Sequence, residues 1–386
     1  MKKHTTLLLA GILAAGTALA GNPDRAGSAG AGQLLINPWA ASNGLAGINM
    51  ASVRGLESTF NNVAGLAFVN RNELTFSNSM YMSGTGIRIN SVGFATKVGD
   101  SGVLGLDVSS MSFGDIPITT EDLPEGGIGS FSPAFSRLGV SYAREFSNSI
   151  YGGLTMRIVS ESISNVRASG VCFDAGIRYV TGENDKLRFG IALRNVGAPM
   201  RYAGDGLTVT ATPQGADESL TVFQRSEKYE LPSLVNIGLA VDVVSNDNNT
   251  VTINGQFVSN SFTKDQLGAS VEANLGDRLV LRGGYLWEQG LLNAAQDVST
   301  AYTGPAGGIG LNLPAGTDAV LKLDYTLGGV RRHFWPALVN AHDIWLRTQP
   351  VNNPDIWRSK TQPDIYQAVL KLLSGSFENP PVNGPP

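Results

Sequence analysis

The side chains that could perform covalent chemistry are few in this sequence. It contains three histidines and one cysteine, and two of the histidines, His333 and His342, lie close to the C-terminal end. A Ser–His–Asp triad needs a histidine that neighbouring groups hold in place, and the pair His342–Asp343 offers no such setting. The lone Cys172 has no disulfide partner within the chain and cannot form a cysteine-rich metal site. We therefore predict that the protein is not an enzyme.

Three polar or glycine-rich stretches are the remaining candidates for a ligand loop. The clusters EGGIGSF (125–131) and GPAGGIGLN (304–312) lack the glycine spacing and the strand-then-helix context of a phosphate loop. The stretch SNDNNT (245–250) lacks the ligand spacing of a calcium loop and is predicted to be a hairpin turn. No catalytic, cofactor or metal site is predicted. The net charge of -4 gives no basic excess, so nucleic acid is not an expected partner.

The N-terminus, residues 1–20, has the pattern of a secretory signal peptide. Lys2 and Lys3 precede an apolar run from Leu7 to Ala15, and Ala18-Leu19-Ala20 stands before Gly21 as an A-x-A cleavage site. The alternative, a membrane anchor helix, would need about 20 apolar residues. No later stretch approaches that length, so a membrane-spanning form of this protein must be a β-barrel.

The strands that must carry any functional side chain are recognised by their alternation. In CFDAGIRYVTGENDKLRFGIALRNV (172–196) apolar residues alternate with polar or small ones on either side of the turn TGENDK, which is typical of strands with one apolar and one polar face. A soluble sandwich would bury the apolar face in its core, whereas a barrel would turn it to lipid. In a barrel, the residues expected to face lipid are Phe173, Ile177, Phe189, Ile191 and Leu193. The polar candidates expected to face the lumen are Arg157, Asp174, Arg178, Arg188 and Arg194.

The lengths of the connections distinguish the two architectures. Thirteen strand segments are predicted, at 72–82, 86–98, 101–113, 136–147, 150–162, 169–180, 186–197, 232–244, 250–262, 266–274, 277–288, 306–313 and 318–326. Short connections alternate with longer ones near 112–135, 161–169, 197–231 and 289–305, and the third contains two strand-like pieces, 207–212 and 219–224. Outer-membrane barrels place short turns on the periplasmic rim and long loops outside. We predict an all-β, antiparallel transmembrane barrel of about 14 strands in the bacterial outer membrane, surrounded by lipid.

Two segments fall outside this pattern. Residues 21–70 are rich in Gly, Ala, Ser and Asn, and are predicted to form a plug-like segment ahead of a barrel at 71–330. Residues 331–386 hold three of the five Trp and eight of the 18 Pro. Because single-chain barrels have even strand numbers, a closing strand is due directly after residue 326. This atypical tail is either an appended segment with a closing strand near 333–347, or the product of a frameshift near residue 328. The abrupt change in composition favours the frameshift.

Two stretches resemble a known family. LLINPWAASNGLAGINMASVRGLESTFNNVAGLAF (34–68) and GVSYAREFSNSIYGGLTMRIVSESISNVRASGVCFDAGIRYVTG (139–182) are similar to the PorV/PorQ family, Bacteroidota relatives of the FadL transporters. The family's Asn-Pro-Ala-Gly-Leu motif corresponds here to Asn62, Val63, Ala64, Gly65 and Leu66, with valine in place of proline. The resemblance implies a FadL-like barrel of about fourteen strands with its N-terminal segment against the lumen.

For PorV-like members the resemblance also implies a role in type IX secretion. Such a barrel would bind the C-terminal signal of exported cargo and pass it from the translocon to a surface attachment complex. The alternative is a FadL-like transporter of hydrophobic small molecules, which would need an apolar path through the lumen. A structural or adhesive surface barrel is a third possibility. The polar character of the named inward residues favours the secretion role.

Overall fold

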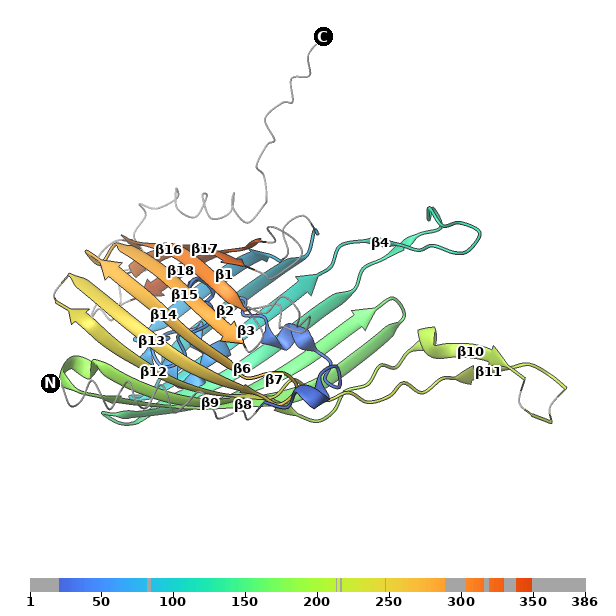
Figure 1. Cartoon of the computed structure of the whole chain (residues 1–386), viewed down its shortest axis with the longest axis horizontal. Helices are drawn as coiled ribbons and strands as arrows, with labels where there is room; N and C mark the ends of the chain where they lie inside the picture. Colours follow the sequence, from blue (N-terminus) through green and yellow to red (C-terminus); the bar gives the residue numbers. More distant parts are fainter. Residues whose placement is uncertain are drawn as a thin grey trace, which may run out of the picture. The chain divides into compact units, whose positions relative to one another are not determined.

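The computed structural model describes residues 21–81, 85–212, 214–215, 217–246, 248–288, 303–315, 319–329 and 338–348. Fourteen antiparallel strands close into one barrel (Figure 1), in the order β1-β18-β17-β16-β15-β14-β13-β12-β9-β8-β7-β6-β3-β2. Their bounds are β1 Asn72–Met80, β2 Arg88–Val98, β3 Gly102–Ser112, β6 Ala134–Ser147, β7 Ile150–Ile163, β8 Val166–Thr181, β9 Leu187–Gly197, β12 Leu234–Ser245, β13 Asn249–Asn260, β14 Gln266–Leu275, β15 Leu279–Glu288, β16 Gly304–Pro314, β17 Ala319–Gly329 and β18 Leu338–Thr348. The predicted all-β barrel is confirmed.

The closing strand comes from the atypical C-terminal region. Strand β18 pairs with β17 on one side and with β1 on the other, so that Leu338 lies opposite Gly329 and Thr348 lies opposite Asn72. This pairing supplies the even strand number that closure requires. The remainder of the expected tail, residues 331–337 and 349–386, lies outside the described residues. The frameshift hypothesis stays a prediction, because a closing strand at this place agrees with either origin of the segment.

The connections sort onto two rims, as the alternation of loop lengths predicts. One rim carries short turns, such as 99–101, 148–149 and 276–278. The opposite rim, called the outer rim below, carries the long connections. Two of these contain separate two-stranded sheets, β4 Ile116–Pro117 with β5 Ser130–Phe131 and β10 Thr208–Ala211 with β11 Leu220–Phe223.

The prediction of a long connection at 161–169 is wrong. Strand β7 continues to Ile163 and β8 starts at Val166, so the connection is the two-residue turn Ser164–Asn165. The backbone of Ser164 has a φ of 48° there, which suits a tight hairpin turn. The sequence ESISNVRAS (161–169) shows no alternation, because both strands extend beyond their last outward apolar residues. The ladder persists there without an apolar face.

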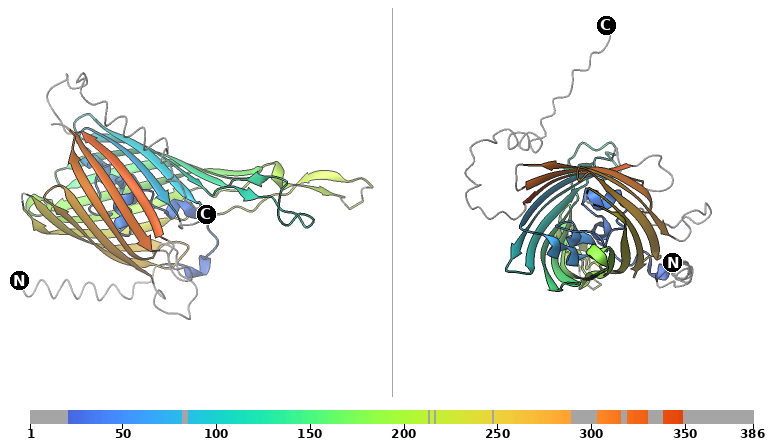
Figure 2. Two further views of the ribbon diagram at one scale, coloured as in Figure 1. Left: turned by 90° about the horizontal axis from the view of Figure 1, so that it is seen from above. Right: turned by 90° about the vertical axis from the view of Figure 1, so that its left-hand side faces the viewer.

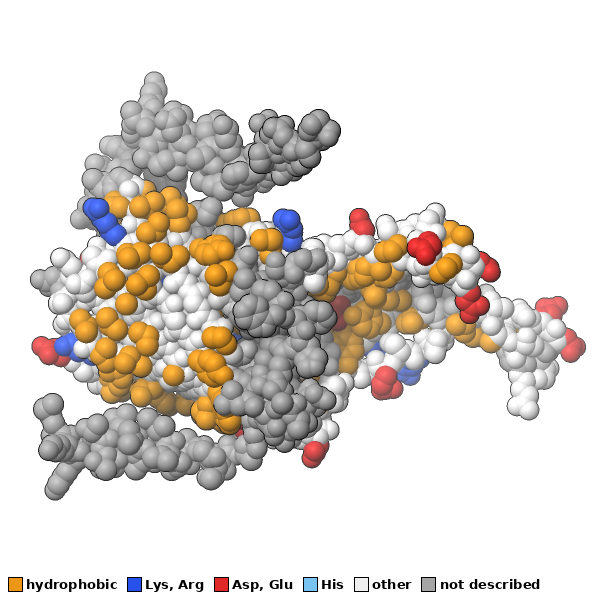
Figure 3. Space-filling model, turned by 45° about the horizontal axis from the view of Figure 1, so that its top comes forward, with side chains coloured by type: hydrophobic (Ala, Val, Ile, Leu, Met, Phe, Trp, Pro, Cys, Tyr) orange, Lys and Arg blue, Asp and Glu red, His pale blue; other side chains and the backbone are white. Residues whose placement is uncertain are grey.

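The two faces of the wall differ sharply in exposure. On β8, Ile177 is 60% exposed on the outside, whereas the next residue, Arg178, is fully buried inside the barrel. Hydrophobic side chains cover much of the outer wall in Figure 3. A closed barrel with an apolar outer face is the architecture of bacterial outer-membrane proteins, and the protein is one of them.

The N-terminal segment, residues 21–70, called the plug below, runs from the outer rim into the lumen and occupies much of it. It consists of short helices: η2 Pro23–Arg25, η3 Gly32–Leu35, α2 Ala40–Gly44, α3 Ser58–Asn61 and η4 Val63–Phe68. The view of Figure 2 along the barrel shows the plug elements within the ring of strands. Among the helices of the described residues, none is long and apolar enough to cross a membrane.

The outward face of β9 provides a test of the register. Ile191→Arg places a charge against lipid in the middle of a strand, which should cost about 2–4 kcal/mol of barrel stability. Ile150→Arg is the matched control, because Ile150 is equally exposed but begins β7 at the short-turn rim. Its cost should be about 0–1 kcal/mol. Urea titration of both variants folded into lipid vesicles measures the difference. Equal stability would mean that Ile191 does not face lipid.

Candidate functional site

The family-like motif in the plug is seated directly on the barrel wall. Asn62 caps helix η4, since its Oδ1 accepts a hydrogen bond from the Ala64 amide at 3.1 Å. Its Nδ2 donates to the carbonyl oxygen of Ile177 in β8 at 3.2 Å. A Cβ atom at Gly176 would overlap Asn62 Oδ1. Asparagine at this position therefore both starts the helix and attaches it to the wall.

The other motif residues pack rather than react. Ala64 and Leu66 are fully buried. A side chain at Gly65 would collide with the Val53 carbonyl oxygen, so only glycine fits this position. Val63 is the first helical residue of η4, where proline is also favoured. The departure from the family pattern is therefore compatible with the same turn.

Glycines on eight strands of the wall leave room for the plug to approach it. At each of these wall positions a Cβ atom would come within 3.1 Å of a plug atom. The pairs of wall glycine and plug residue are Gly93 with Leu56, Gly105 with Leu66, Gly153 with Val63, Gly176 with Asn62, Gly190 with Asn62, Gly238 with Met50, Gly268 with Ile48 and Gly284 with Leu45. We call this set the glycine belt. It spans strands from β2 to β15, so the plug contacts the wall over much of the circumference.

Three of the predicted lumen arginines bind the plug backbone. Arg157 pairs with Asp174 and also donates to the carbonyl oxygen of Thr59. Arg178 donates to the Met50 carbonyl oxygen at 3.1 Å. Arg194 Nη2 lies 3.5 Å from the Leu34 carbonyl oxygen, and its guanidinium lies 4.0 Å from the centre of a plug phenylalanine ring. Their guanidinium groups contact carbonyl oxygens, a carboxylate and an aromatic face, while the Nε atoms of all three lie buried with no hydrogen-bond partner among the described residues.

The two remaining predicted residues act within the wall. Arg188 on β9 forms an ion pair with Asp242 on the neighbouring strand β12, and no contact with the plug is described for it. Asp174 joins two strands, because it pairs with Arg157 on β7 and its Oδ1 accepts from the Asn195 amide on β9 at 2.7 Å. All five predicted polar residues lie inside the barrel and are at most 5% exposed.

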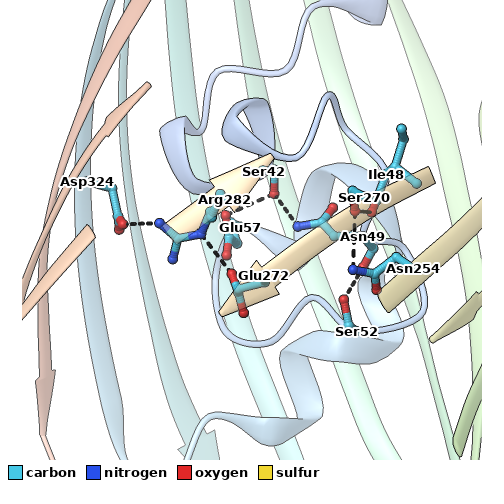
Figure 4. Close-up of polar contacts among 10 residues, drawn as sticks. All are labelled: Ser42, Ile48, Asn49, Ser52, Glu57, Asn254, Ser270, Glu272, Arg282 and Asp324. Carbon is cyan, nitrogen blue, oxygen red and sulfur yellow. Dashed lines mark hydrogen bonds and ion pairs between the residues drawn. The ribbon is translucent and has the colours of Figure 1, made fainter. Parts of the chain in front are cut away.

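A second polar cluster on the opposite wall was not predicted from the sequence. Arg282 on β15 pairs with Glu272 on β14 at 2.7 Å and with Asp324 on β17. Figure 4 shows Glu57 of the plug beside this group. Glu57 accepts a hydrogen bond from Ser42 at 2.9 Å, and Ser42 in turn accepts from Asn49. The alternation of β14, β15 and β17 was the available signal, since each of these residues has an apolar neighbour that points outward.

The ionisable side chains that the structure describes do not form a metal centre. Among the described residues, no group of three or more His, Cys, Asp or Glu side chains is arranged to hold a metal ion. The buried ions instead connect strands to one another and to the plug.

A cavity of about 170 Å³ lies between the plug and the outer half of the wall. Its lining combines apolar and amide side chains, with Arg194 as the charged residue. The apolar side chains include Ile36, Phe60, Tyr81, Leu234, Val258 and Leu286, and the amides include Asn37, Asn61, Asn236, Gln256, Asn260 and Gln266. The wall residues come from the strand ends near the outer rim.

An apolar cluster lies in the same half of the lumen. Its buried members include Leu34, Tyr81, Ile89, Met111, Phe135, Val159, Met200 and Leu231. The prediction that the inward face is polar is therefore wrong for this region. It was drawn from the positions of the five named polar residues, whereas the inward residues of this cluster, such as Ile89 and Phe135, lie at strand ends near the outer rim.

Comparison with known proteins supports the fold. No protein-family model matches the sequence, and no curated protein matches it. Among solved structures, the toluene transporter TodX of Pseudomonas putida is similar with a TM-score of 0.52 and 15% identity, over 81% of this chain and 97% of that one. The toluene transporter TbuX of Ralstonia pickettii has a TM-score of 0.52 and 13% identity, over 81% and 98%. The monoaromatic hydrocarbon channel CymD has a TM-score of 0.50 and 14% identity, over 83% and 99%.

At this level of identity the similarity concerns architecture alone. It supports the β-barrel fold. The comparisons give no support to the finer PorV/PorQ resemblance.

The packing of Asn62 against Gly176 of β8 can be tested by a double-mutant cycle. Asn62→Ala should cost about 1 kcal/mol through the lost helix cap. Gly176→Ala should cost about 1–3 kcal/mol because its Cβ overlaps Asn62. The double variant should be about as stable as Asn62→Ala alone, since the overlapping atom is gone. Stability is measured by urea unfolding in vesicles.

The control for this cycle is Gly255→Ala. Gly255 lies on the outward face of β13 with open space around it, so its substitution should not depend on residue 62. If the losses in unfolding free energy from the Asn62 and Gly176 substitutions were strictly additive, Asn62 would not be packed against Gly176.

Proposed function

We propose that this protein is an outer-membrane channel for small, uncharged hydrophobic molecules. The observation that carries the proposal is the cavity of about 170 Å³ beneath the outer mouth of the barrel. Its lining combines apolar side chains with amides and Arg194, and apolar surface with polar groups that orient the ligand is found in small-molecule sites. The adjacent apolar cluster extends this environment within the outer half of the lumen.

The size of the cavity favours a ligand of about one aromatic ring. A cavity of about 150 Å³ lined by aliphatic and aromatic side chains is large enough to bind benzene. Similar barrels are described as transporters of toluene and channels for monoaromatic hydrocarbons. Arg194, the charged residue of the lining, lies 4.0 Å from the centre of the Phe60 ring and 3.5 Å from the Leu34 carbonyl oxygen.

Passage to the other rim requires the plug to rearrange. The plug meets the wall along the glycine belt and fills the middle of the lumen. A bound molecule therefore needs a local shift of plug residues to leave the cavity inward. This agrees with a slow, selective channel and not with an open water-filled pore.

A second candidate is the secretion role that the PorV/PorQ resemblance implies. The observation in its favour is the outer rim, where the connections around β4–β5 and β10–β11 carry exposed apolar side chains. These include Ile116, Leu123, Ile128, Leu220 and Phe223. Such ribbons could contact a translocon or the C-terminal signal of a cargo protein. Deletion of the gene would separate the two roles: the channel proposal expects impaired hydrocarbon uptake with normal protein export.

The direct test of the channel is to fill the cavity. Ala306 on β16 lines it, so Ala306→Phe should reduce uptake of radiolabelled toluene at least about fivefold by occupying the ligand's space. Ala273→Phe is the matched control, because Ala273 lies on the lipid face of β14, between the outward residues Val271 and Leu275. Uptake is measured in cells with equal amounts of folded protein. Unchanged uptake in Ala306→Phe would contradict the proposed site.

A further inference from the structure

The N-terminal arm of the plug, residues 21–36, lies at the outer rim of the barrel. Gly21 contacts Asp265 in the connection between β13 and β14. Arg25 pairs with Glu230 at 2.7 Å and lies 4.3 Å from the centre of the Phe262 ring. The Gly30 amide donates to the Glu230 carbonyl oxygen at 3.0 Å. From Gly21 at the outer rim the chain thus descends through the lumen to β1.

The contact of Gly21 is closely fitted. Its backbone nitrogen lies 2.7 Å from Asp265 Oδ2. A Cβ atom at residue 21 would lie 2.7 Å from the Asp265 amide nitrogen and 2.8 Å from the Thr263 carbonyl oxygen, both of them backbone atoms. Residue 21 must therefore be glycine for this docking.

The acceptor is a buried carboxylate. Asp265 is only 8% exposed, and its other oxygen lies 3.3 Å from the Asn260 amide nitrogen. A buried carboxylate is costly unless hydrogen bonds and a positive charge compensate it. The sequence places the end of the signal peptide between Ala20 and Gly21, so cleavage there would create a positive charge at the nitrogen that Asp265 already contacts.

We propose that the Asp265 carboxylate is the binding site for the α-ammonium group of the mature N-terminus. Hydrolysis of the Ala20–Gly21 bond adds the hydroxyl of water to the Ala20 carbonyl carbon. The released Gly21 nitrogen takes the remaining proton of that water and a further proton from solvent, which makes the ammonium. This ammonium pairs with Asp265 and fastens the arm across the outer mouth, beside the cavity that Leu35 and Ile36 line. An uncleaved chain offers only a neutral amide at the same place.

The inference does not depend on what the channel carries, so its test avoids uptake. Mass spectrometry of protein from outer membranes should find Gly21 as the first residue. Reductive methylation in native membranes then reports the availability of the α-amine. Asp265→Asn should raise its rate of methylation roughly tenfold, since a charge-assisted hydrogen bond is lost. Asp277→Asn is the matched control, because Asp277 lies in the β14–β15 turn on the opposite rim and should leave the rate unchanged.

A second pair of variants tests the steric requirement. Gly21→Ala keeps a small residue after the cleavage site, but its Cβ would overlap the backbone of residues 263 and 265. The arm should therefore detach from the outer rim. Trypsin added to intact cells should then cleave after Arg25 several-fold faster than in wild type. Gly32→Ala is the control within the same arm, because a Cβ there meets open space.

Three results would overturn the proposal. The mature chain could begin at another residue. The α-amine could react equally fast in wild type and Asp265→Asn. External trypsin could fail to reach Arg25 in Gly21→Ala cells while cutting it after lysis.

Discussion

The close approach between a wall of glycines and the plug is the constraint on which the rest of the structure depends. A barrel of this size would enclose a wide lumen, and the plug fills it only because the glycine belt lets side chains such as Met50, Leu56 and Asn62 reach the backbone of the wall. A Cβ at these positions would force the plug away from the strands. The buried carbonyl oxygens of the plug would then lose their contacts with the arginines. The cavity would also lose the plug residues that line it.

The charged interior follows from the same contact. Arginines in a barrel cost little on the water-filled side but are expensive when the lumen is packed. Here Arg157, Arg178 and Arg194 meet carbonyl oxygens of the plug, while Arg188 and Arg282 pair with carboxylates on adjacent strands. The cluster at Arg282 joins three strands beside Glu57 of the plug. Apolar side chains are left to collect near the outer rim, and there the cavity forms. The cavity lies on the outer side of these polar contacts and is lined by both apolar and amide side chains.

Much of this architecture could be predicted from period-two alternation, which depends only on which face meets lipid. It placed Ile177 outside and Arg178 inside, and it located thirteen of the fourteen barrel strands near their observed positions. It failed where no face meets lipid: at 161–169, where the β7–β8 ladder outlasts its apolar face, and at the outer end of the lumen, where Ile89 and Phe135 point inward. The recurrence of glycine at inward positions such as Gly93, Gly105 and Gly176 was visible in the sequence. Its meaning depended on the plug, whose irregular helices carry no periodic signal.

Hydrogen exchange of the plug amides in the folded protein, measured by mass spectrometry in lipid vesicles, tests most directly whether the plug is seated on the wall. If the glycine belt holds it, amides in residues 40–69 should be protected nearly as well as those of β7 and β8, because they open only when the barrel loosens. Exchange of these amides within seconds, while the barrel strands stay protected, would show a plug that does not rest on the wall. That result would contradict the arrangement on which the cavity and the proposed channel depend.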